Sequence, residues 1–247
     1  MTLSMNPPSA PLAPLPDGIA RVLCVVAHPD DMEYGTSAVV SHWTRHGVEV
    51  AYLLLTAGEA GMQRPPEEAG PLRAQEQRRA CDTVGVSDLT ILDHPDGQLV
   101  YGLDLRRSIA REIRRFRPDT VVTGPFALEA AWGLDQADHR SAGLATVDAV
   151  RDADNTWVFR ELAEDEGLVK WHTSRILVAG GSPPTHAFEV DATSKAAAVA
   201  SLSCHEAYLA DLAWHPAPEA LLTDAFAGQG RRAGLAAAVL FRMYDLG

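Results

Sequence analysis

The segment VLCVVAHPDDMEYG, residues 22–35, carries an apolar run directly into a cluster of one imidazole and two carboxylates. The run VLCVVA predicts a buried strand. His28 and Asp31 are three residues apart, so a tight turn or a first helical turn brings them to one side while Asp30 points elsewhere. These residues alone allow two interpretations. One is a metal site whose free carboxylate acts as a base; the other is a strand-to-helix turn with acids near the helix N-terminus.

Strand and helix patterns alternate through the first 150 residues. Strands are expected at 21–27, 49–56, 89–92 and 120–124, and helices at 36–46, 72–84, 103–116 and 138–152. This alternation predicts an α/β fold with a mostly parallel sheet, right-handed crossovers and helices on both faces. Farther along, the patterns indicate strands at 175–181, 187–190 and 238–245 and a helix at 194–209.

The composition is that of an ordinary globular protein, with 47% hydrophobic and 22% charged residues in a chain of 247. A net charge of −12 argues against nucleic acid or an anionic membrane as a partner. No apolar run approaches the ~20 residues of a membrane span. Three widely spaced cysteines fit a reducing compartment, so a cytoplasmic location is expected. The Pro-rich start, residues 1–19, lacks the basic region of a signal peptide and is expected to be a disordered tail before one domain over 20–247.

Polar clusters follow three of the expected strands: HPDD at 28–31, DHPDG at 93–97 and DQADH at 135–139. In parallel sheets ligands bind outside the carboxyl ends of the strands, so three such clusters at one edge favour the metal site over the turn. A catalytic zinc site needs three ligands and an open position, which His28, Asp31 and His139 would supply. A bound metal would lower the pKa of its water to ~7, and Asp30 would take a proton as that water attacks a carbonyl. The predicted reaction is metal-assisted hydrolysis of an amide or ester.

The sequence resembles the PIG-L-type (LmbE-like) family of zinc-dependent N-deacetylases. The resemblance runs from about Arg21 to Leu209 and rests on AHPDD, RAQEQRRACDTVGV leading to LTILDHPDG, ADH, and DATSKAAAVASLSCHEAYL. It implies a Rossmann-like three-layer fold and removal of an acetyl group from small molecules that contain N-acetylglucosamine. It also implies Zn²⁺, or another divalent metal such as Fe²⁺. The motif match assigns the metal to His28, Asp31 and His139, and the role of general base to Asp30.

Three further residues are assigned by the same resemblance. Arg73 stands where the family places a substrate-contacting arginine, although an ordinary surface charge on a helix is the alternative. Asp96 corresponds to an acid that binds sugar hydroxyls, although Pro-Asp-Gly is also a common turn. His205 matches a family histidine and is expected to be structural, and His94 is given no role.

One position departs from the family pattern. The family usually has HPDH, where this chain has Gln136-Ala137-Asp138-His139. A glutamine amide can donate a hydrogen bond to a developing oxyanion but cannot carry a proton to the leaving amine. The loss of one oxyanion donor costs ~10²–10³ in rate. Three alternatives stay open: Asp30 returns the proton itself, the substrate has a better leaving group, or a histidine from elsewhere fills the role. Asp138 is expected to be a helix cap, with contact to His139 as the alternative.

Several rival functions are weighed against this one. No Gly-rich fingerprint follows the first strand, which argues against a dinucleotide-binding protein. A non-haem iron oxygenase would use the same ligand types, but we expect an H-x-D spacing on an all-β scaffold there. Two other functions also stay open: an amidase for a non-sugar or thiol-conjugate amide, and a non-catalytic sugar-binding protein. Association of the chain into a homo-oligomer stays open as well. The loops 57–70 and 124–137 are expected to frame the pocket, with Trp132 as a stacking surface for a sugar.

Overall fold

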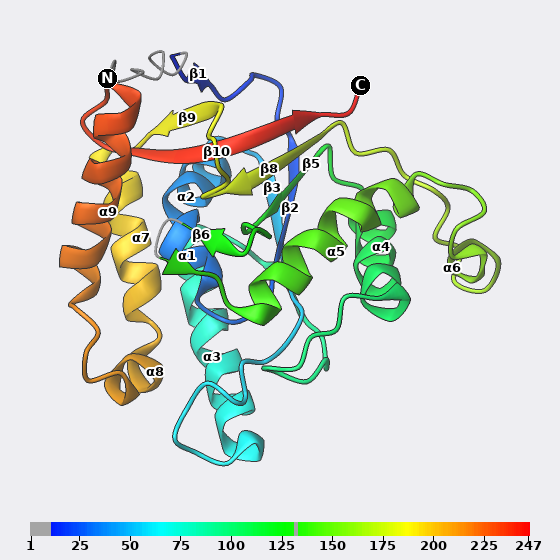
Figure 1. Ribbon diagram of the computed structural model, residues 1–247, viewed down its shortest axis with the longest axis horizontal. Coiled ribbons are helices and arrows are strands. Elements are labelled where there is room, and N and C mark those ends of the chain that lie inside the picture. The colour runs from blue at the N-terminus through cyan, green and yellow to red at the C-terminus, as the bar shows by residue number, and fades with distance from the viewer. Residues whose placement is uncertain (1–10, 131–132) are drawn as a thin grey trace, which may run out of the picture.

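The computed structural model describes residues 11–130 and 133–247. These residues form an eight-stranded sheet in the order β1-β9-β10-β8-β5-β2-β3-β4 (Figure 1). Its strands are β1 (Ala13–Pro14), β2 (Arg21–Val26), β3 (Glu49–Leu54), β4 (Asp88–Ile91), β5 (Thr120–Thr123), β8 (Arg175–Ala179), β9 (His186–Glu189) and β10 (Ala238–Asp245). Strand β10 runs antiparallel to β8 and β9, and the other pairings described in this sheet are parallel. The predicted mostly parallel sheet is confirmed.

Helices cover both faces of the sheet, on the left and on the right in Figure 1. One side holds α1 (Asp31–Gly35), α2 (Ser37–Arg45), α3 (Pro66–Val84), α7 (Ala192–Ser203), α8 (Glu206–Asp211) and α9 (Pro218–Ala233). The other side holds α4 (Leu103–Phe116), α5 (Ala137–Ala153) and α6 (Arg160–Glu164). Side chains of β2 alternate between the two cores: Val22 and Cys24 pack on the first side, Leu23 and Val25 on the second. The sequence 22–27 is therefore apolar throughout because both faces of its strand are covered, and the predicted three-layer fold is confirmed.

The described part of the expected tail joins the sheet. Ala13–Pro14 pairs in parallel with β9, and Leu15 and Ile19 pack against the core. Proline content predicted disorder there, but a proline can occupy a short edge strand, where one side of the backbone needs no partner. Residues 1–10 lie outside the described residues, and the domain boundary at residue 20 stays a prediction. Among the described residues, no helix is both long and apolar enough to cross a membrane.

Two expected boundaries are corrected by the structure. Helix α3 begins at Pro66, so the end of the loop expected over 57–70 is helical; proline at the first helical position and Glu67 and Glu68 in the first turn favour this start. The single helix expected over 194–209 is α7 followed by α8, and its N-cap is Asp191, whose side chain accepts a hydrogen bond from the backbone of Ser194. Helices α6 and α9 and the small hairpin of β6 (Glu129–Ala130) and β7 (Gly133–Leu134) were not predicted.

Candidate metal centre

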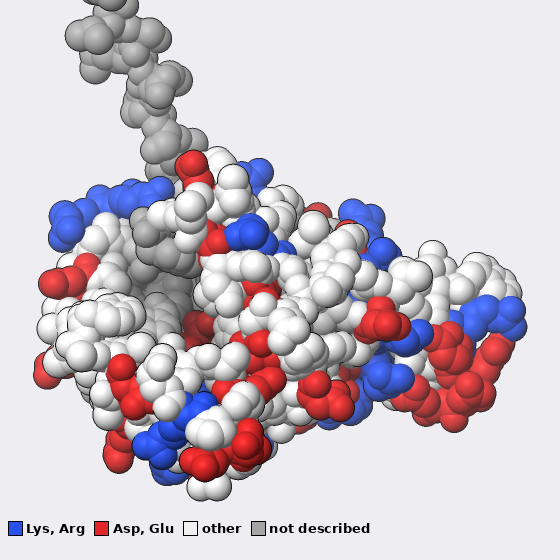
Figure 2. Space-filling view, turned by 60° about the horizontal axis from the view of Figure 1, so that its bottom comes forward, with Lys and Arg blue, Asp and Glu red and all other residues white. Residues whose placement is uncertain are grey.

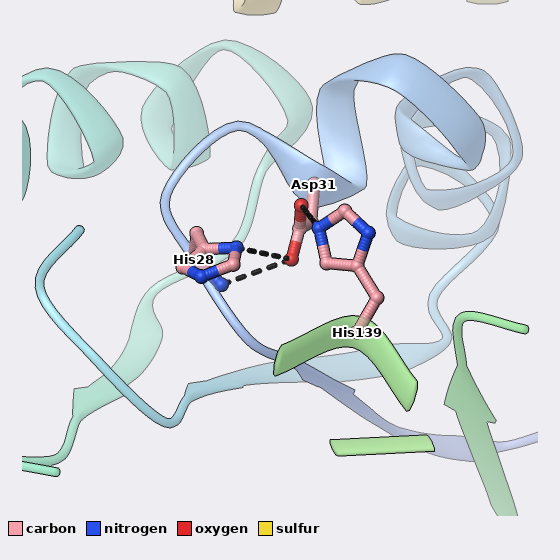
Figure 3. Close-up of side chains that lie close together, drawn as sticks. All are labelled: His28, Asp31 and His139. Carbon is pink, nitrogen blue, oxygen red and sulfur yellow. Dashed lines mark hydrogen bonds and ion pairs between the residues drawn. The ribbon is translucent and has the colours of Figure 1, made fainter. Parts of the chain in front are cut away.

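The three polar clusters meet at one edge of the sheet, as predicted. His28 lies in the turn between β2 and α1, Asp31 opens α1, and His139 lies in the first turn of α5. Asp31 Oδ1 is 3.1 Å from His139 Nε2, and Asp31 Oδ2 is 3.7 Å from His28 Nδ1 (Figure 3). One oxygen and two ring nitrogens all lie within 4.8 Å of one another. This is the donor set of a site with three protein ligands.

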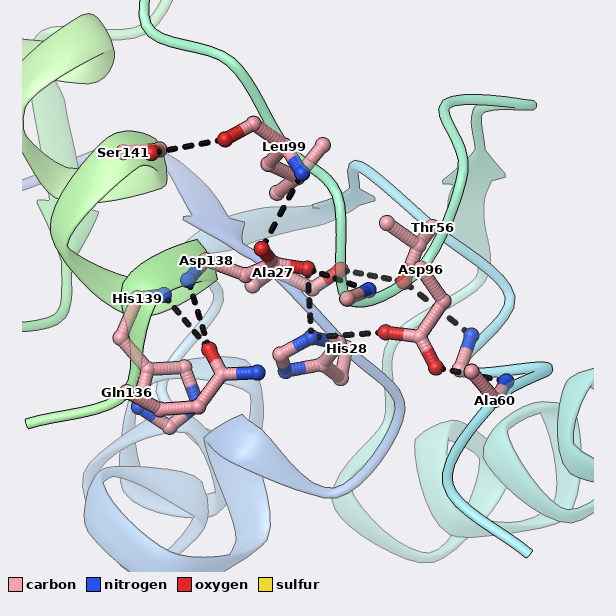
Figure 4. Close-up of polar contacts among 12 residues, drawn as sticks. Ala27, His28, Thr56, Ala60, Asp96, Leu99, Gln136, Asp138, His139 and Ser141 are labelled. Atoms are coloured by element: carbon pink, nitrogen blue, oxygen red, sulfur yellow. Dashed lines mark hydrogen bonds and ion pairs between the residues drawn. The ribbon is translucent and has the colours of Figure 1, made fainter.

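His28 is held from its other side by two carboxylates. Its Nε2 lies 2.9 Å from Asp96 Oδ1 and 3.4 Å from Asp138 Oδ2 (Figure 4). Asp138 also accepts hydrogen bonds from the backbone N–H groups of Gly97 and Leu99, at 2.7 and 3.1 Å. In the neutral ring the proton then belongs on Nε2, and Nδ1 presents its lone pair toward Asp31. His28, Asp96 and Asp138 could themselves be taken for a ligand set, but their contacts are those of a metal-binding histidine with its outer partners.

The expected role of Asp138 as a helix cap is wrong. Helix α5 is capped by Gln136, whose Oε1 accepts the backbone N–H groups of Asp138 at 2.7 Å and His139 at 3.2 Å. Asp138 is instead fully buried against His28. The polar partner of His139 is Asp135, with Oδ1 3.1 Å from Nδ1. Asp135 was not predicted, although a carboxylate one helical turn before a ligand histidine is a signal that could have identified it.

The electrostatics of the cluster favour positive charge. Burial by itself lowers the pKa of His28, but hydrogen bonds to Asp138, Asp31 and Asp96 outweigh it and raise the pKa to about 12. His139 follows the same pattern, and Asp31 raises its pKa to about 9. Partial burial by itself raises the pKa of the Asp31 carboxyl, yet the two imidazoles hold it well below the usual range. A divalent cation would take the place of these ring protons, so the residues fit a metal ion.

Asp30 is set apart from the ligands by its backbone. It precedes α1 with φ of 85°, in the left-handed region that a non-glycine residue rarely adopts. Its side chain is buried, its Oδ1 lies 3.3 Å from Arg73 Nη2, and its Oδ2 has no hydrogen-bond partner among the described residues. Burial raises the pKa of Asp30 to about 7, against the opposing charge of Arg73. A strained residue with an unpartnered buried oxygen is a signature of a functional position.

Arg73 is no ordinary surface charge, since only 2% of the residue is exposed. Its guanidinium donates to the carbonyl oxygens of Gly58 at 2.9 Å and Pro29 at 2.7 Å, and it lies 4.0 Å from the ring centre of Tyr208. A Cβ at Gly58 would overlap the guanidinium, which explains a glycine there beyond its φ of +64°. Arg73 therefore ties the loop after β3 to the turn that carries Asp30.

A cavity of about 310 Å³ opens over the cluster, a size that suits a small molecule. Two of its walls come from the loops expected to frame the pocket, Ala60 and Gly61 from the first and Gln136 from the second. Trp132 lies outside the described residues. The amide nitrogen of Gln136 points toward His28 and the cavity, because its oxygen is taken by the helix (Figure 4). The lining residues are His28, Asp30, Asp31, Tyr34, Ala60, Gly61, Arg73, Asp96, Gly97, Gln136, His139 and Tyr208.

The two remaining histidines of interest do not line this cavity. His205 is fully buried, with Nε2 3.6 Å from Glu33 Oε2. His94 Nε2 lies 3.2 Å from Ser108 Oγ. Figure 2 shows a face on which most side chains are uncharged, with basic side chains gathered at the upper left and acidic ones at the right end.

Residues 23–150 match the model of the PIG-L family, described as GlcNAc-PI de-N-acetylase. The chain belongs to this family, and the predicted resemblance is confirmed. A diacetylchitobiose deacetylase of Thermococcus kodakarensis is 33% identical over 135 residues, which are 53% of this chain and 49% of that protein. A 1D-myo-inositol 2-acetamido-2-deoxy-alpha-D-glucopyranoside deacetylase of Kineococcus radiotolerans is 31% identical over 164 residues, 53% of this chain and 44% of its own. The chain thus spans about half the length of the curated relatives it matches.

Solved structures confirm the fold. The N,N'-diacetylchitobiose deacetylase from Pyrococcus horikoshii superposes with a TM-score of 0.83 over 92% of this chain and 84% of its own, at 22% identity. The 4-carboxy-2-hydroxymuconate hydratase GalB from Pseudomonas putida KT2440 reaches 0.72 over 93% and 98%, at 14% identity. Since a deacetylase and a hydratase share this fold, the reaction has to be argued from the site.

Proposed function

We propose that this protein is a zinc-dependent hydrolase that removes an acetyl group from the amide nitrogen of a small amino-sugar-containing substrate. The observation that carries the proposal is the buried carboxylate of Asp30, a residue that lies beside a His-Asp-His cluster and lines a small-molecule cavity. One oxygen of this carboxylate has no hydrogen-bond partner among the described residues. The names of the relatives support the substrate class, since they are deacetylases of diacetylchitobiose and of an acetamido-glucopyranoside.

His28 Nδ1, Asp31 and His139 Nε2 would hold the metal ion. Two imidazole nitrogens and one carboxylate, with a position left for water, suit Zn²⁺, and Fe²⁺ accepts the same donors. When bound, zinc supplies positive charge that polarises a carbonyl and lowers the pKa of a water to ~7. Asp96 and Asp138 hold the His28 ring in the required orientation from behind.

Asp30 acts as the general base at its free Oδ2, where it accepts a proton from the attacking water. A group with a pKa near the working pH is suited to both accepting and returning a proton, and burial moves Asp30 toward that range. Asp30 then delivers the proton to the leaving amine, because Gln136 has none to give. The amide nitrogen of Gln136 donates a hydrogen bond to the carbonyl oxygen as negative charge develops on it.

Arg73 and Asp96 keep their predicted role as substrate contacts, since both line the cavity. Each also has a task within the protein: Arg73 holds the turn of Asp30, and Asp96 holds His28. The free thiols of Cys24 and Cys81, both buried, fit the cytoplasm as the location. Association of copies of the chain stays a prediction.

A non-catalytic sugar-binding protein is the less favoured function. Burial of an unpartnered carboxylate oxygen is costly, and a binding protein gains nothing from that cost at Asp30. An amidase for a non-sugar or thiol-conjugate amide would use the same residues and differ in the cavity wall. The substrate panel must therefore include both kinds of amide.

The test compares zinc-loaded wild type with Asp30→Asn on N-acetylglucosamine, diacetylchitobiose, N-acetylglucosaminyl inositol and simple thiol-conjugate acetamides, with amine release as the readout. We expect Asp30→Asn to lose ~10²–10⁴ in kcat with zinc still bound. Asp224→Asn, an exposed acid on α9, is the matched control and should equal wild type. If wild type and Asp30→Asn are equally inert on the whole panel while both hold zinc, the proposed function is wrong.

A further inference from the structure

A buried hydrogen-bond network holds the backbone of Asp30. The backbone N–H of Asp30 donates to Gln77 Oε1 at 2.9 Å. Gln77 lies on α3, is 1% exposed and is not among the residues that line the cavity. A side chain 47 positions away in sequence therefore satisfies the backbone donor of the proposed base.

The orientation of the Gln77 amide is fixed by Glu33. Gln77 Nε2 donates toward both oxygens of the Glu33 carboxylate, at 3.3 and 3.4 Å. Glu33 is fully buried and also accepts a hydrogen bond from Ser201 Oγ at 3.0 Å. A flipped amide would set oxygen against the carboxylate and NH₂ against the N–H of Asp30. Only one orientation of Gln77 satisfies both neighbours.

The turn that this network holds, at Asp30, has a strained backbone. Asp30 adopts φ of 85°, and a residue in this region persists only where its surroundings impose the conformation. The same conformation separates Asp30 from Asp31, so that Asp31 meets the two imidazoles while Asp30 faces Arg73 and the cavity. The carboxyl group of Glu33 is itself buried, and its Oε2 lies 3.6 Å from His205 Nε2.

We propose that Gln77, oriented by Glu33, is a positioning residue that fixes the left-handed turn at Asp30 and so aims the Asp30 carboxylate at the cavity. Gln77 does not line the cavity, and the hydrogen bonds described for it go to Asp30, Glu33 and Cys81, so its path to the reacting groups runs through Asp30. The proposal rests on the proposed function for its catalytic consequence.

The first test is Gln77→Met, which keeps the length of the side chain and removes both hydrogen bonds. We expect kcat on the best acetamide to fall 10–100-fold, with KM and bound zinc close to wild type. The melting temperature should also fall, because the buried N–H of Asp30 and the Glu33 carboxylate each lose a partner. The amide proton of Asp30 should exchange faster with solvent by NMR, because it loses its acceptor. Gln75→Met is the matched control, an exposed glutamine two residues earlier on the same helix, and should change neither quantity.

The second test is a rescue. Gln77→Glu sets two carboxylates against each other and should lose at least as much kcat as Gln77→Met. The double variant Glu33→Gln with Gln77→Glu restores a donor facing an acceptor and should recover most of that loss.

The proposal is overturned if the Asp30 amide exchanges at the wild-type rate in Gln77→Met, or if kcat falls only in proportion to a loss of bound zinc. It is also overturned if the double variant recovers nothing. A wild type that is inert on every amide would refute the proposed hydrolase. The role of Gln77 would still be decided separately, by the exchange rate of the Asp30 amide.

Discussion

His28 Nε2 lies 2.9 Å from Asp96 Oδ1. Asp96, which was predicted to contact the substrate, therefore contacts a predicted metal ligand on the ring nitrogen that faces away from Asp31. The other oxygen of Asp96 accepts the backbone N–H of Ala60 at 2.8 Å, which fixes the carboxylate at both ends. A carboxylate in this place orients the imidazole and makes its opposite nitrogen a stronger donor to a cation. Asp96 therefore connects the loop that contains Ala60 to the imidazole of His28.

The first prediction separates the two roles of Asp96. In Asp96→Asn the neutral amide supports the His28 ring less strongly, so we expect zinc affinity to fall 10–100-fold, measured by competition with a chelator. A residue that only contacted sugar would raise KM and leave zinc affinity as it was. Asp93→Asn, an exposed acid in the same loop, should bind zinc like wild type. Unchanged affinity in Asp96→Asn would contradict the support of His28.

Gln136 has two separable tasks, since its oxygen caps α5 and its nitrogen faces the cavity. Gln136→Glu keeps an oxygen for the backbone N–H groups of Asp138 and His139 and removes the donor. We expect the melting temperature to hold and kcat to fall ~10²–10³-fold. Gln136→Ala should lose the cap as well, at a further cost of about 1 kcal/mol in unfolding free energy. A fully active Gln136→Glu would show that the amide nitrogen does not act on the substrate.

The proximity of the proposed ligands could be predicted because part of their arrangement is set by short-range geometry. His28 and Asp31 are three residues apart at the end of a buried strand, and the turn that follows brings them together. The prediction of His139 needed one further step, the rule that the carboxyl ends of parallel strands lie at the same edge of a sheet. The strand ends of β2, β4 and β5 obey that rule, which is why the three clusters meet.

The supporting residues could not be predicted because their partners lie far away in sequence. Asp138 was expected to cap a helix, a local role, but it is 110 residues from the imidazole that it contacts. The bond from Asp30 to Gln77 depends on how α3 packs beside α1, and no periodicity in the sequence specifies that. Arg73 was predicted to contact the substrate, with a surface charge on a helix as the alternative, and its burial by the loop after β3 could not be read from the sequence.

The free energy of unfolding of a Gly58 variant tests how firmly the Arg73 guanidinium is held in place. Gly58→Ala would place a methyl group against the Arg73 guanidinium at a residue with φ of +64°. Gly234 has a similar φ of +73° with nothing within 4 Å of an added Cβ, so Gly234→Ala reports the backbone strain by itself. We expect about 1 kcal/mol of destabilisation for Gly234→Ala and about 1–3 kcal/mol more for Gly58→Ala, by denaturant unfolding. Equal losses would mean that Arg73 moves aside freely.

The pH dependence of activity tests the pairing of Asp30 with Arg73. A general base must be ionised, so kcat/KM should fall as the pH drops through the pKa of Asp30. Burial raises this pKa to about 7, and the Arg73 guanidinium 3.3 Å away opposes the rise. Arg73→Met should therefore move the acidic limb to higher pH. Arg79→Met, on the exposed side of the same helix, is the control. An acidic limb that stays in place in Arg73→Met would contradict this electrostatic coupling.

Removal of the metal should cost more stability at alkaline than at acidic pH. In the metal-free protein the pKa of His28 is raised to about 12 and that of His139 to about 9, both above the ~6.5 of the unfolded chain. The stability from these ring protons is fully present below pH ~6.5 and is lost as the pH rises through about 9 for His139. The same protons compete with zinc, so zinc binds more tightly as they leave.

We expect the gap in melting temperature between zinc-loaded and chelator-treated protein to be wider at pH ~9 than at pH ~6. His139→Gln should narrow the gap at both pH values, while His172→Gln, an exposed histidine paired with Asp154, should not. A gap that is constant or wider in acid would mean that the metal does not replace protons on these two rings.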